Sequence, residues 1–356
     1  MNSLENARNQ INEIDKQMAV LFESRMSAIE NVIAYKMQNN LPVLDESREN
    51  FVIEKNQEYI KNKKYQDYYV QFLKDVMNVS KNYQKSIAYA DCVGYQGVEG
   101  AFAHIATKHL FKESKLKSYQ TFEDIFKAVQ LGNIAYGVLP FENSYTGEVG
   151  EVFDLLYQYD CKINQIYDLK INQNLLVLPS TKLDDIKQVY SHHQALTQCK
   201  QFFDTHPAYE AVPYANTALA ALYVSQTKDK SKAAVASKET AELYGLDVLV
   251  ENINTSSENT TRFIVISKKM PQEGNCFNIM FTVDHNAGQL ASVIQIISKY
   301  GFNMESIKSK SIHNLPWQYY FYAELQGNVN DKNAKALIDE LQEKCKTFKV
   351  IGVYDK

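Results

Sequence analysis

Residues 8–48 read RNQINEIDKQMAVLFESRMSAIENVIAYKMQNNLPVLDESR, and this stretch decides the fold of the first part of the chain. Apolar residues recur in it at intervals of three and four from Ile11 to Ile33, and no glycine or proline precedes Pro42. The pattern predicts one amphipathic α-helix of about 50 Å. We expect residues 1–85 to be helical, with Pro42 as the only break.

The predicted helix carries cations at fixed positions. Arg8 and Arg25 lie about 26 Å apart along its axis and on different faces, whereas Arg25 and Lys36 share a face. Both arginines can therefore contact one small molecule only if one of them comes from a second copy of the chain. A lone arginine on a helix is usually a solvated surface charge, so the interpretation depends on the whole set.

Over residues 4–85 the chain resembles the helical class of chorismate mutase, whose chains intertwine as dimers. A single matching residue is weak support, but the ordered set is specific. The matching positions are Arg8, Ile14-Asp15, Arg25, Lys36, Pro42-Val43, Asp45, Arg48, Glu49, Ser80 and Gln84.

The resemblance implies a pericyclic rearrangement of chorismate that needs no nucleophile, proton relay or metal. The site must fold a small dianion into its reactive conformer and stabilise charge on the breaking ether oxygen. By resemblance, Lys36 and Gln84 donate to that oxygen. The other predicted chorismate contacts are Arg8 from the partner chain, Arg25, Arg48 and Ser80 at the carboxylates, and Asp45 and Glu49 at the ring hydroxyl.

Composition excludes several classes of protein. At 356 residues the chain is long enough for two or three domains, and its net charge of −4 provides no basic field for nucleic acid. No apolar run approaches the roughly 20 residues of a membrane span, and the polar start does not read as a secretory signal. Five scattered cysteines without a CxxC pair indicate a cytoplasmic protein with no disulfide framework and no zinc site.

Beyond residue 85 short apolar runs alternate with amphipathic stretches up to residue 267, which predicts an α/β domain of two lobes with a cleft between them. A linker follows, and residues 275–356 read β-α-β-β-α-β, the order of a ferredoxin-like unit. The domains expected are thus 1–85, 86–267 and 275–356. The strands predicted in the middle domain are Ile87–Val93, Ile134–Leu139, Leu175–Leu178, Gln188–Tyr190, Ala233–Ala236 and Arg262–Ile266. The helices predicted there are Phe122–Leu131, Gly150–Tyr159, Ala195–Thr205, Thr217–Gln226 and Lys238–Tyr244.

Polar segments stand at the ends of these predicted elements, where open α/β sheets bind ligands. They are Gly97–His104, Pro140–Gly147, Ser191–Gln194 and Asn259–Phe263. Each also has a plain structural interpretation: the glycines as a turn, Asn143 as a helix cap, and Thr261 as an ordinary strand residue. Neither a GxGxxG loop nor an H-E-x-x-H pattern is present, so we expect no nucleotide cofactor and no metal, even at His192 and His193.

Together these segments resemble prephenate dehydratase over residues 86–267, through Glu142-Asn143-Ser144, Ser191-His192, Gln198 and Thr261-Arg262-Phe263. Val98 and His193 stand where that family commonly has proline. The resemblance implies a two-lobed fold like that of periplasmic binding proteins, and loss of carbon dioxide and hydroxide from prephenate to give phenylpyruvate. By resemblance Thr261 donates a hydrogen bond to the leaving oxygen, and Arg262 supplies positive charge for a carboxylate. The predicted prephenate contacts are Asn143, Ser144, Ser191, Gln198, Thr261, Arg262 and Phe263.

Residues 276–356 resemble an ACT domain, a regulatory module that binds amino acids at dimer interfaces. The matching stretch is Gly288-Gln289-Leu290 at the first helix, in which Gln289 replaces the alanine of the family, and Ser309 matches in the second strand. In dehydratases controlled by phenylalanine the motif around Ser309 reads Glu-Ser-Arg-Pro, whereas here Lys308, Lys310 and Ser311 replace the glutamate, arginine and proline. The resemblance implies L-phenylalanine as the effector; the alternative is a domain that only holds a dimer together.

The combined expectation is a cytoplasmic bifunctional chorismate mutase–prephenate dehydratase of phenylalanine biosynthesis. It would act on chorismate and prephenate without a cofactor, as a homodimer or a higher homo-oligomer. Two alternatives stay open: a non-catalytic sensor of an aromatic metabolite, and an enzyme in which only one of the two sites works.

Overall fold

The structure is a computed structural model that describes residues 3–312 and 315–356. The chain divides into two compact units. The N-terminal unit comprises the residues up to 91 together with 131–133, and the second unit comprises 92–130 and 134–356.

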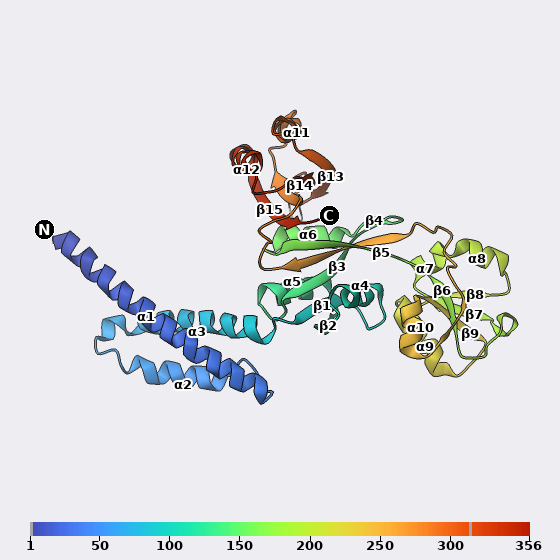
Figure 1. Cartoon of the computed structure of the whole chain (residues 1–356), viewed down its shortest axis with the longest axis horizontal. Coiled ribbons are helices and arrows are strands. Elements are labelled where there is room, and N and C mark those ends of the chain that lie inside the picture. Colours follow the sequence, from blue (N-terminus) through green and yellow to red (C-terminus); the bar gives the residue numbers. More distant parts are fainter. Residues whose placement is uncertain (1–2, 313–314) are drawn as a thin grey trace. The chain divides into compact units, whose positions relative to one another are not determined.

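The N-terminal unit is helical, as expected from its apolar spacing (Figure 1). Its elements are α1 (Ser3–Gln38), α2 (Glu46–Gln57), the short 3₁₀ helix η1 (Lys63–Tyr65) and α3 (Gln66–Ala88). The chain breaks at Pro42 as predicted, and Asp45 caps α2 by accepting a hydrogen bond from the backbone N–H of Arg48. A second break, between α2 and α3, was not predicted.

Only the C-terminal half of α1 is covered within this chain. Ile29 and Ile33 are buried, and α1 contacts α3 there. Further toward the N-terminus the apolar side chains of the same helix are exposed: Ile11 by 57%, Ile14 by 54% and Leu21 by 68%. The apolar stripe that predicts the helix therefore continues past the part of it that this chain packs against.

The middle of the chain forms two lobes, as expected. The strands of the first lobe are β1 (Cys92–Gln96), β2 (Lys115–Tyr119), β3 (Tyr136–Asn143), β4 (Gly147–Glu148), β5 (Lys162–Lys170) and β11 (Thr260–Ser267). Its helices are α4 (Phe102–Leu110), α5 (Phe122–Gln130) and α6 (Gly150–Gln158). Parallel pairing of β1 with β2 and β3 is combined with antiparallel pairing of β11 with β3 and β5.

The second lobe is a separate five-stranded sheet in the order β10-β6-β9-β7-β8. Its strands are β6 (Asn174–Val177), β7 (Gln188–Ser191), β8 (Glu210–Pro213), β9 (Lys232–Ala236) and β10 (Asp247–Val250). Its helices are η2 (Leu183–Asp185), α7 (His193–Gln198), α8 (Lys200–Thr205), α9 (Thr217–Thr227) and α10 (Lys238–Tyr244). The chain passes between the lobes twice, after β5 and before β11, which gives the periplasmic-binding-protein-like arrangement (Figure 1).

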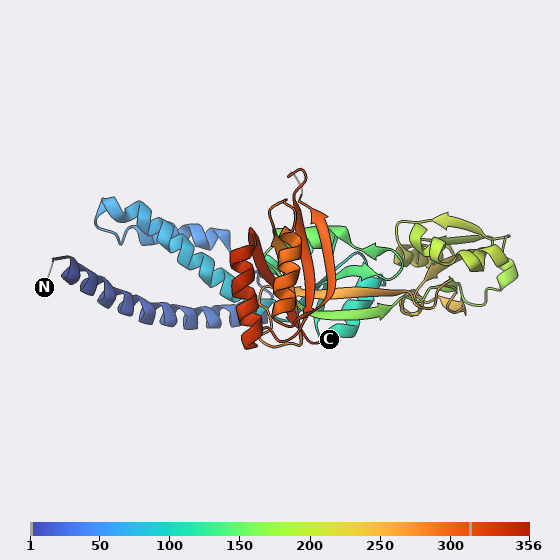
Figure 2. The same cartoon turned by 90° about the horizontal axis from the view of Figure 1, so that it is seen from above.

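The C-terminal ferredoxin-like domain comprises β12 (Cys276–Thr282), α11 (Gln289–Lys299), β13 (Asn303–Ser311), β14 (Tyr319–Gln326), α12 (Lys332–Lys344) and β15 (Thr347–Tyr354). Its strand order, β13-β14-β12-β15, confirms the predicted β-α-β-β-α-β topology. Figure 2 shows α11 and α12 on one face of this sheet. Gly352 pairs with Ile163 of β5, which joins this sheet to that of the first lobe.

Some predicted elements differ from the observed ones. Ile87 and Ala88 form the last residues of α3, and the strand expected at Ile87–Val93 starts only at Cys92. The helix expected over Ala195–Thr205 is interrupted at Cys199. Strands β2, β4, β5, β8 and β10 fall outside the predicted set. In β2 and β5, lysines and other polar residues interrupt the apolar pattern.

Close packing of α5 on β3 generates a prediction about Gly137. A Cβ atom at this position would lie 2.3 Å from Cγ2 of Ile125 and 3.2 Å from Cγ1 of Ile266. Overpacking of this kind costs about 1–3 kcal/mol, so Gly137→Ala should lower the free energy of unfolding by that amount in a urea titration. With Ile125→Ala added, the double variant should lose less than the sum of the two single losses. Strict additivity would contradict the predicted clash.

Candidate active sites

A cavity of about 420 Å³ lies between the two lobes of the second unit. Both lobes contribute to its wall, mostly at the ends of strands and the starts of helices. The lining residues include four predicted prephenate contacts, Asn143, Gln198, Thr261 and Phe263.

Asn143 and Thr261 form the centre of this wall. They lie opposite each other on the antiparallel strands β3 and β11, so both side chains emerge on the same face of the sheet. Nδ2 of Asn143 donates to Oγ1 of Thr261 at 2.9 Å. The threonine oxygen is thereby engaged as an acceptor, and its own O–H group remains available to donate.

Asn143 is itself held in place on both sides. Its Nδ2 also donates to Oδ1 of Asn259 at 2.9 Å, and its Oδ1 accepts from the backbone N–H groups of Tyr145 and Thr146 at 2.9 and 3.0 Å. The side chain is 8% exposed. Its amide orientation is therefore determined by the fold, which gives the hydrogen bond to Thr261 one geometry.

Gln198 and Phe263 complete the predicted part of the wall. Phe263 follows Thr261 by two positions on β11 and is buried, so it supplies an apolar surface on the same face. Gln198, at the end of α7, is 7% exposed. Within the described part of the chain its side-chain amide has no hydrogen-bond partner, which leaves it available to a ligand in the cavity.

Three predicted contacts lie away from the cavity wall. Arg262 alternates with Thr261 along β11, so it points to the opposite face, where it binds Asp168 through two hydrogen bonds of 2.9 and 3.2 Å. That pairing raises the pKa of Arg262. Ser191 is fully buried and donates to the carbonyl of Val235 at 2.6 Å, which ties β7 to β9.

Ser144 is the third of these residues. Its hydroxyl donates to the carbonyl of Glu258 and accepts from the N–H of Thr260, both at 3.0 Å. It thus fastens the end of β3 to the segment that precedes β11. The structure therefore gives Ser144, Ser191 and Arg262 bonds that hold strands in place, and does not bring them to the cavity wall.

The other polar groups of the wall are Gln96, Gln173, His192, Gln194, Asn216 and Thr217. His192 and Gln194 belong to the predicted polar segment Ser191–Gln194, whereas Gln96, Gln173, Asn216 and Thr217 were not among the predicted site residues. Among the described residues that line the cavity there is no lysine or arginine. Positive potential comes instead from helix N-termini: α4 begins at Phe102 and α9 at Thr217, and both starts line the cavity. First-turn N–H groups have no partner within their helix and attract anions. Asn216 could have been noted, because asparagine before an apolar run is an N-cap signature.

Several of the predicted chorismate contacts come together in the N-terminal unit, on helices α1, α2 and α3. Arg25 of α1 donates to the hydroxyl of Ser80 on α3, and burial lowers the pKa of this arginine. Glu49 of α2 forms a 3.0 Å ion pair with Lys81, the neighbour of Ser80. Lys36 donates to the carbonyl of Val43 at 2.7 Å.

Gln84 lies one helical turn after Ser80 and is 9% exposed. Its Oε1 is buried and has no hydrogen-bond partner among the described residues. An unpaired buried amide is costly in a folded protein, and its position beside the Arg25–Ser80 contact is typical of a binding site.

The remaining predicted chorismate contacts are less enclosed. Asp45 is exposed, and its pKa is lowered chiefly by the hydrogen bond from the backbone of Arg48. The guanidinium of Arg48 lies 5.3 Å from the ring centre of Phe51 on its own helix. Arg8 is exposed on the half of α1 that this chain does not cover, so a single chain does not bring it to Arg25.

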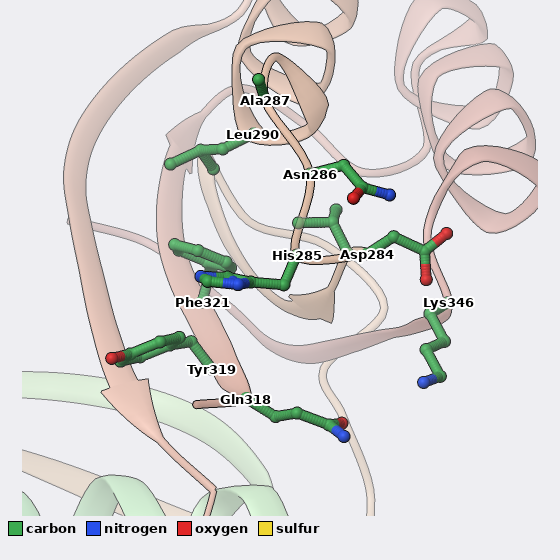
Figure 3. Close-up of a pocket in the computed structure, with 10 residues that line it drawn as sticks. Asp284, His285, Asn286, Ala287, Leu290, Gln318, Tyr319, Phe321 and Lys346 are labelled. Carbon is green, nitrogen blue, oxygen red and sulfur yellow. The ribbon is translucent and has the colours of Figure 1, made fainter. Parts of the chain in front are cut away.

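A second cavity, of about 450 Å³, lies in the ferredoxin-like domain between the end of β12, the start of α11 and β14. Figure 3 shows Leu290, Tyr319 and Phe321 on one side of it and Asp284 and Lys346 on the other. Of the predicted regulatory residues, Leu290 lines the cavity. Gly288 adopts φ +84 as the N-cap of α11, a conformation that favours glycine and turns the chain into the helix. Gln289 and Ser309 are not part of the lining.

Metal sites and membrane-spanning helices are two further possibilities for residues 3–312 and 315–356. There, no group of three or more histidine, cysteine, aspartate and glutamate side chains is arranged to hold a metal ion. In the same residues, no helix combines the length and apolar character needed to cross a membrane.

Comparisons with known proteins match this geometry. A sequence model of the prephenate dehydratase family matches residues 93–271, and one of chorismate mutase type II matches residues 7–85. The bifunctional chorismate mutase/prephenate dehydratase of Aquifex aeolicus is 29% identical over 100% of this chain and 99% of its own length. That of Stutzerimonas stutzeri is 31% identical over 74% of this chain and 73% of its own.

A solved structure extends the likeness to the fold. Prephenate dehydratase from Arthrobacter aurescens, solved in complex with L-Phe, is 22% identical and superimposes with a TM-score of 0.68. The match covers 74% of this chain and 90% of that one. With a dehydratase family match over half of its length and relatives that align from end to end, this chain belongs to the bifunctional chorismate mutase/prephenate dehydratase family.

Proposed function

We propose that the N-terminal unit rearranges chorismate to prephenate and that the cavity between the two lobes converts prephenate to phenylpyruvate. The observation that carries this proposal is the Asn143–Thr261 hydrogen bond at a cavity whose described lining holds no lysine or arginine. This pair supplies a hydroxyl donor of defined direction, which a leaving hydroxide requires. The functional domains are assigned to residues 1–85, 86–267 and 275–356. We assign the chain to the cytoplasm, which suits five cysteines that, in the described structure, form no disulfide bond with one another.

In the dehydratase step the ring of prephenate loses its carboxyl group as carbon dioxide and its C4 hydroxyl as hydroxide. The electron pair of the breaking C–C bond completes the aromatic ring, and the electrons of the C–O bond leave with the oxygen. Thr261 donates its hydroxyl hydrogen bond to that oxygen. Because Asn143 already donates to Oγ1, the Thr261 proton is directed away from the sheet, and the bond strengthens as negative charge develops.

The carboxylates of prephenate need compensation that the lining side chains do not provide. We assign this role to the first-turn N–H groups of α4 and α9, which start at the cavity wall. Ala101, the N-cap of α4, makes no side-chain capping bond, so the first-turn donors of α4 are left for a ligand. In α9 the side chain of Asn216 already accepts from the N–H of Leu219, which leaves the earlier N–H groups of that turn. Gln198 adds an amide from α7.

In the mutase step the enzyme must position chorismate and stabilise its ether oxygen. The contact between Arg25 and Ser80 presents a guanidinium to one carboxylate, and Lys36 lies on the same face of α1. Oε1 of Gln84 has no hydrogen-bond partner in the part of the chain that the structure describes, so the side-chain amide is free to take the orientation that substrate requires. A half-turn of the amide exchanges Oε1 and Nε2, and Nε2 then donates to the ether oxygen of chorismate.

The dehydratase and mutase sites can be tested separately in a coupled assay. Purified chain given chorismate should release phenylpyruvate. Thr261→Val should accumulate prephenate instead, because valine keeps the shape and removes the donor; a loss of about 10²-fold in turnover is expected for one transition-state donor. Lys36→Ala should leave chorismate unchanged yet still consume added prephenate.

Thr261→Ser is the matched control, since it keeps the hydroxyl and should retain most of the dehydratase turnover. Full dehydratase turnover by Thr261→Val would refute the assigned role of Thr261. Unchanged chorismate with the wild-type chain would refute the mutase assignment and favour the sensor interpretation.

We also assign the exposed half of α1 to a homodimer interface that brings Arg8 of one chain to the mutase site of the other. The exposure of Ile11, Ile14 and Leu21 supports this, since a partner helix would bury them. Arg8 also lies too far along α1 from Arg25 for both to serve one ligand from the same chain.

Complementation between inactive chains tests this shared site. Arg8→Ala and Arg25→Ala should each lose mutase activity by at least 10-fold, because each removes a charge from a dianion site. Co-refolded mixtures should regain up to about a quarter of wild-type activity, since a mixed dimer combines one intact site with one doubly impaired site. No recovery in a mixture shown to contain mixed dimers would contradict the assignment of Arg8 to the partner's site.

The cavity of Figure 3 suits a zwitterionic aromatic amino acid, and we assign it to L-phenylalanine as a feedback effector. Leu290 and Phe321 offer apolar contact to a ring, Asp284 suits an ammonium group, and Lys346 suits a carboxylate. The solved Arthrobacter dehydratase, which was crystallised with L-Phe, has the same fold.

L-Phenylalanine should therefore lower phenylpyruvate formation from prephenate. Leu290→Asp should raise the half-inhibitory concentration by about 10-fold or more, because it places a carboxylate where the ring would pack. D-Phenylalanine serves as the control, since it exchanges the positions of the two charged groups. Equal inhibition of wild type and Leu290→Asp would contradict the assignment of this cavity.

A further inference from the structure

Two lysines of the ferredoxin-like domain reach the catalytic lobe. Lys308 and Lys310 lie on the same, half-buried face of β13, whereas the residues that alternate with them are exposed. Nζ of Lys308 forms a 2.7 Å ion pair with Oε1 of Glu142. These lysines stand at two of the three positions at which the chain departs from the Glu-Ser-Arg-Pro motif; the third is Ser311.

Lys310 binds the start of α6. Its Nζ donates to the carbonyl of Gly150 at 2.7 Å and lies 3.4 Å from Oδ2 of Asp154. The hydroxyl of Tyr320, opposite Lys310 on β14, donates to the other oxygen of Asp154 at 2.6 Å. A Cβ atom at position 150 would lie only 2.5 Å from this Nζ, so glycine is what permits the approach.

The two lysines thus hold both ends of one segment, residues 142–150. This segment contains Asn143, whose Nδ2 donates to Thr261, and Thr146, whose N–H donates to Oδ1 of Asn143. Thr146 also accepts a 3.2 Å hydrogen bond from Nε2 of Gln194, which belongs to the other lobe and lines the cavity. The segment therefore carries a donor to the reacting hydroxyl and a contact between the lobes.

Register makes the connection at Glu142 direct. Glu142 pairs with Arg262 across β3 and β11, and the next pair along is Asn143 with Thr261. The first pair faces the ferredoxin-like domain and the second faces the cavity, because successive side chains alternate across a sheet. A shift of Glu142 must therefore move the backbone that positions Asn143.

We propose that Lys308 and Lys310 are positioning residues for the dehydratase reaction, acting through the 142–150 segment on Asn143. The inference rests on the dehydratase function proposed above. Both ion pairs are mostly shielded from solvent: the side chains are 26% and 34% exposed for Lys308 and Glu142, and 18% and 16% for Lys310 and Asp154. Such shielding gives each pair a defined geometry, unlike an exposed ion pair.

Steady-state kinetics with prephenate test this role in the full chain. Lys308→Gln should lower dehydratase kcat by about 10-fold and change KM less, since a small displacement of a group that acts in the transition state costs rate rather than binding. Glu142→Gln should have the same effect, and the double variant should be little worse than either single one. Gly150→Ala should act like Lys310→Met, because each breaks the contact at the start of α6.

Lys299→Gln is the matched control. Lys299 forms an ion pair of the same length, 2.7 Å, with Glu340, but this pair lies between α11 and α12 and does not touch the catalytic lobe. The dehydratase kcat of Lys299→Gln should stay within about two-fold of the wild-type value, because the loss of an exposed ion pair changes stability little. Mutase activity, measured on the same preparations, reports whether each variant is intact.

Hydrogen exchange gives a readout independent of turnover. The N–H groups of Tyr145 and Thr146 should exchange faster in Lys308→Gln and Lys310→Met than in Lys299→Gln. Unchanged exchange, or faster exchange with unchanged kcat, would overturn the positioning role. A wild-type chain that makes no phenylpyruvate from prephenate would instead refute the dehydratase function, and the exchange experiment would still decide whether the lysines hold the segment.

Discussion

The antiparallel pairing of β3 with β11 is the constraint on which the second unit depends. It places Asn143 opposite Thr261 and fixes the hydrogen bond between them. A slip of β11 by one residue would turn Thr261 to the other face of the sheet and remove it from Asn143 and the cavity. The bonds of Ser144 to Glu258 and Thr260 hold this register at the end where the cavity lies.

Side chains alternate between the two faces of the same strands, so one face contributes residues to the cavity and the other contributes bonds that hold the strands in place. Thr261 and Phe263 face the cavity, whereas Arg262 faces away and is neutralised by Asp168. The Arg262 cation is thereby kept off the cavity wall, where the helices α4 and α9 begin, and the proposed function assigns the binding of the prephenate carboxylates to those helix N-termini. Backbone donors of this kind are held rigidly by their helices and need no reorganisation when charge moves during the reaction.

Sequence motifs predicted the chemistry better than the geometry. The pair Asn143 and Thr261 was predictable, because both occur in short, specific motifs, and the ferredoxin-like order followed from apolar spacing. The orientation of Arg262 was not predictable. The motif shows that Arg262 is next to Thr261 in the sequence, but only the strand shows that the two side chains lie on opposite faces of the sheet. The wall residues Asn216 and Thr217 carry no charge and resemble an ordinary helix start, and the lysine-interrupted β2 lacks the apolar pattern that indicates a strand.

Strand β14 shows how the ferredoxin-like domain is connected to the reaction. Tyr319 lines the cavity of Figure 3, and the next residue, Tyr320, binds Asp154 in the middle of α6. Successive strand residues point to opposite faces, so one strand meets both an effector-sized cavity and the catalytic lobe. If L-phenylalanine binds this cavity as proposed, β14 provides a direct backbone connection from Tyr319 at the ligand to the contact that Tyr320 makes with α6, the helix that follows the segment carrying Asn143.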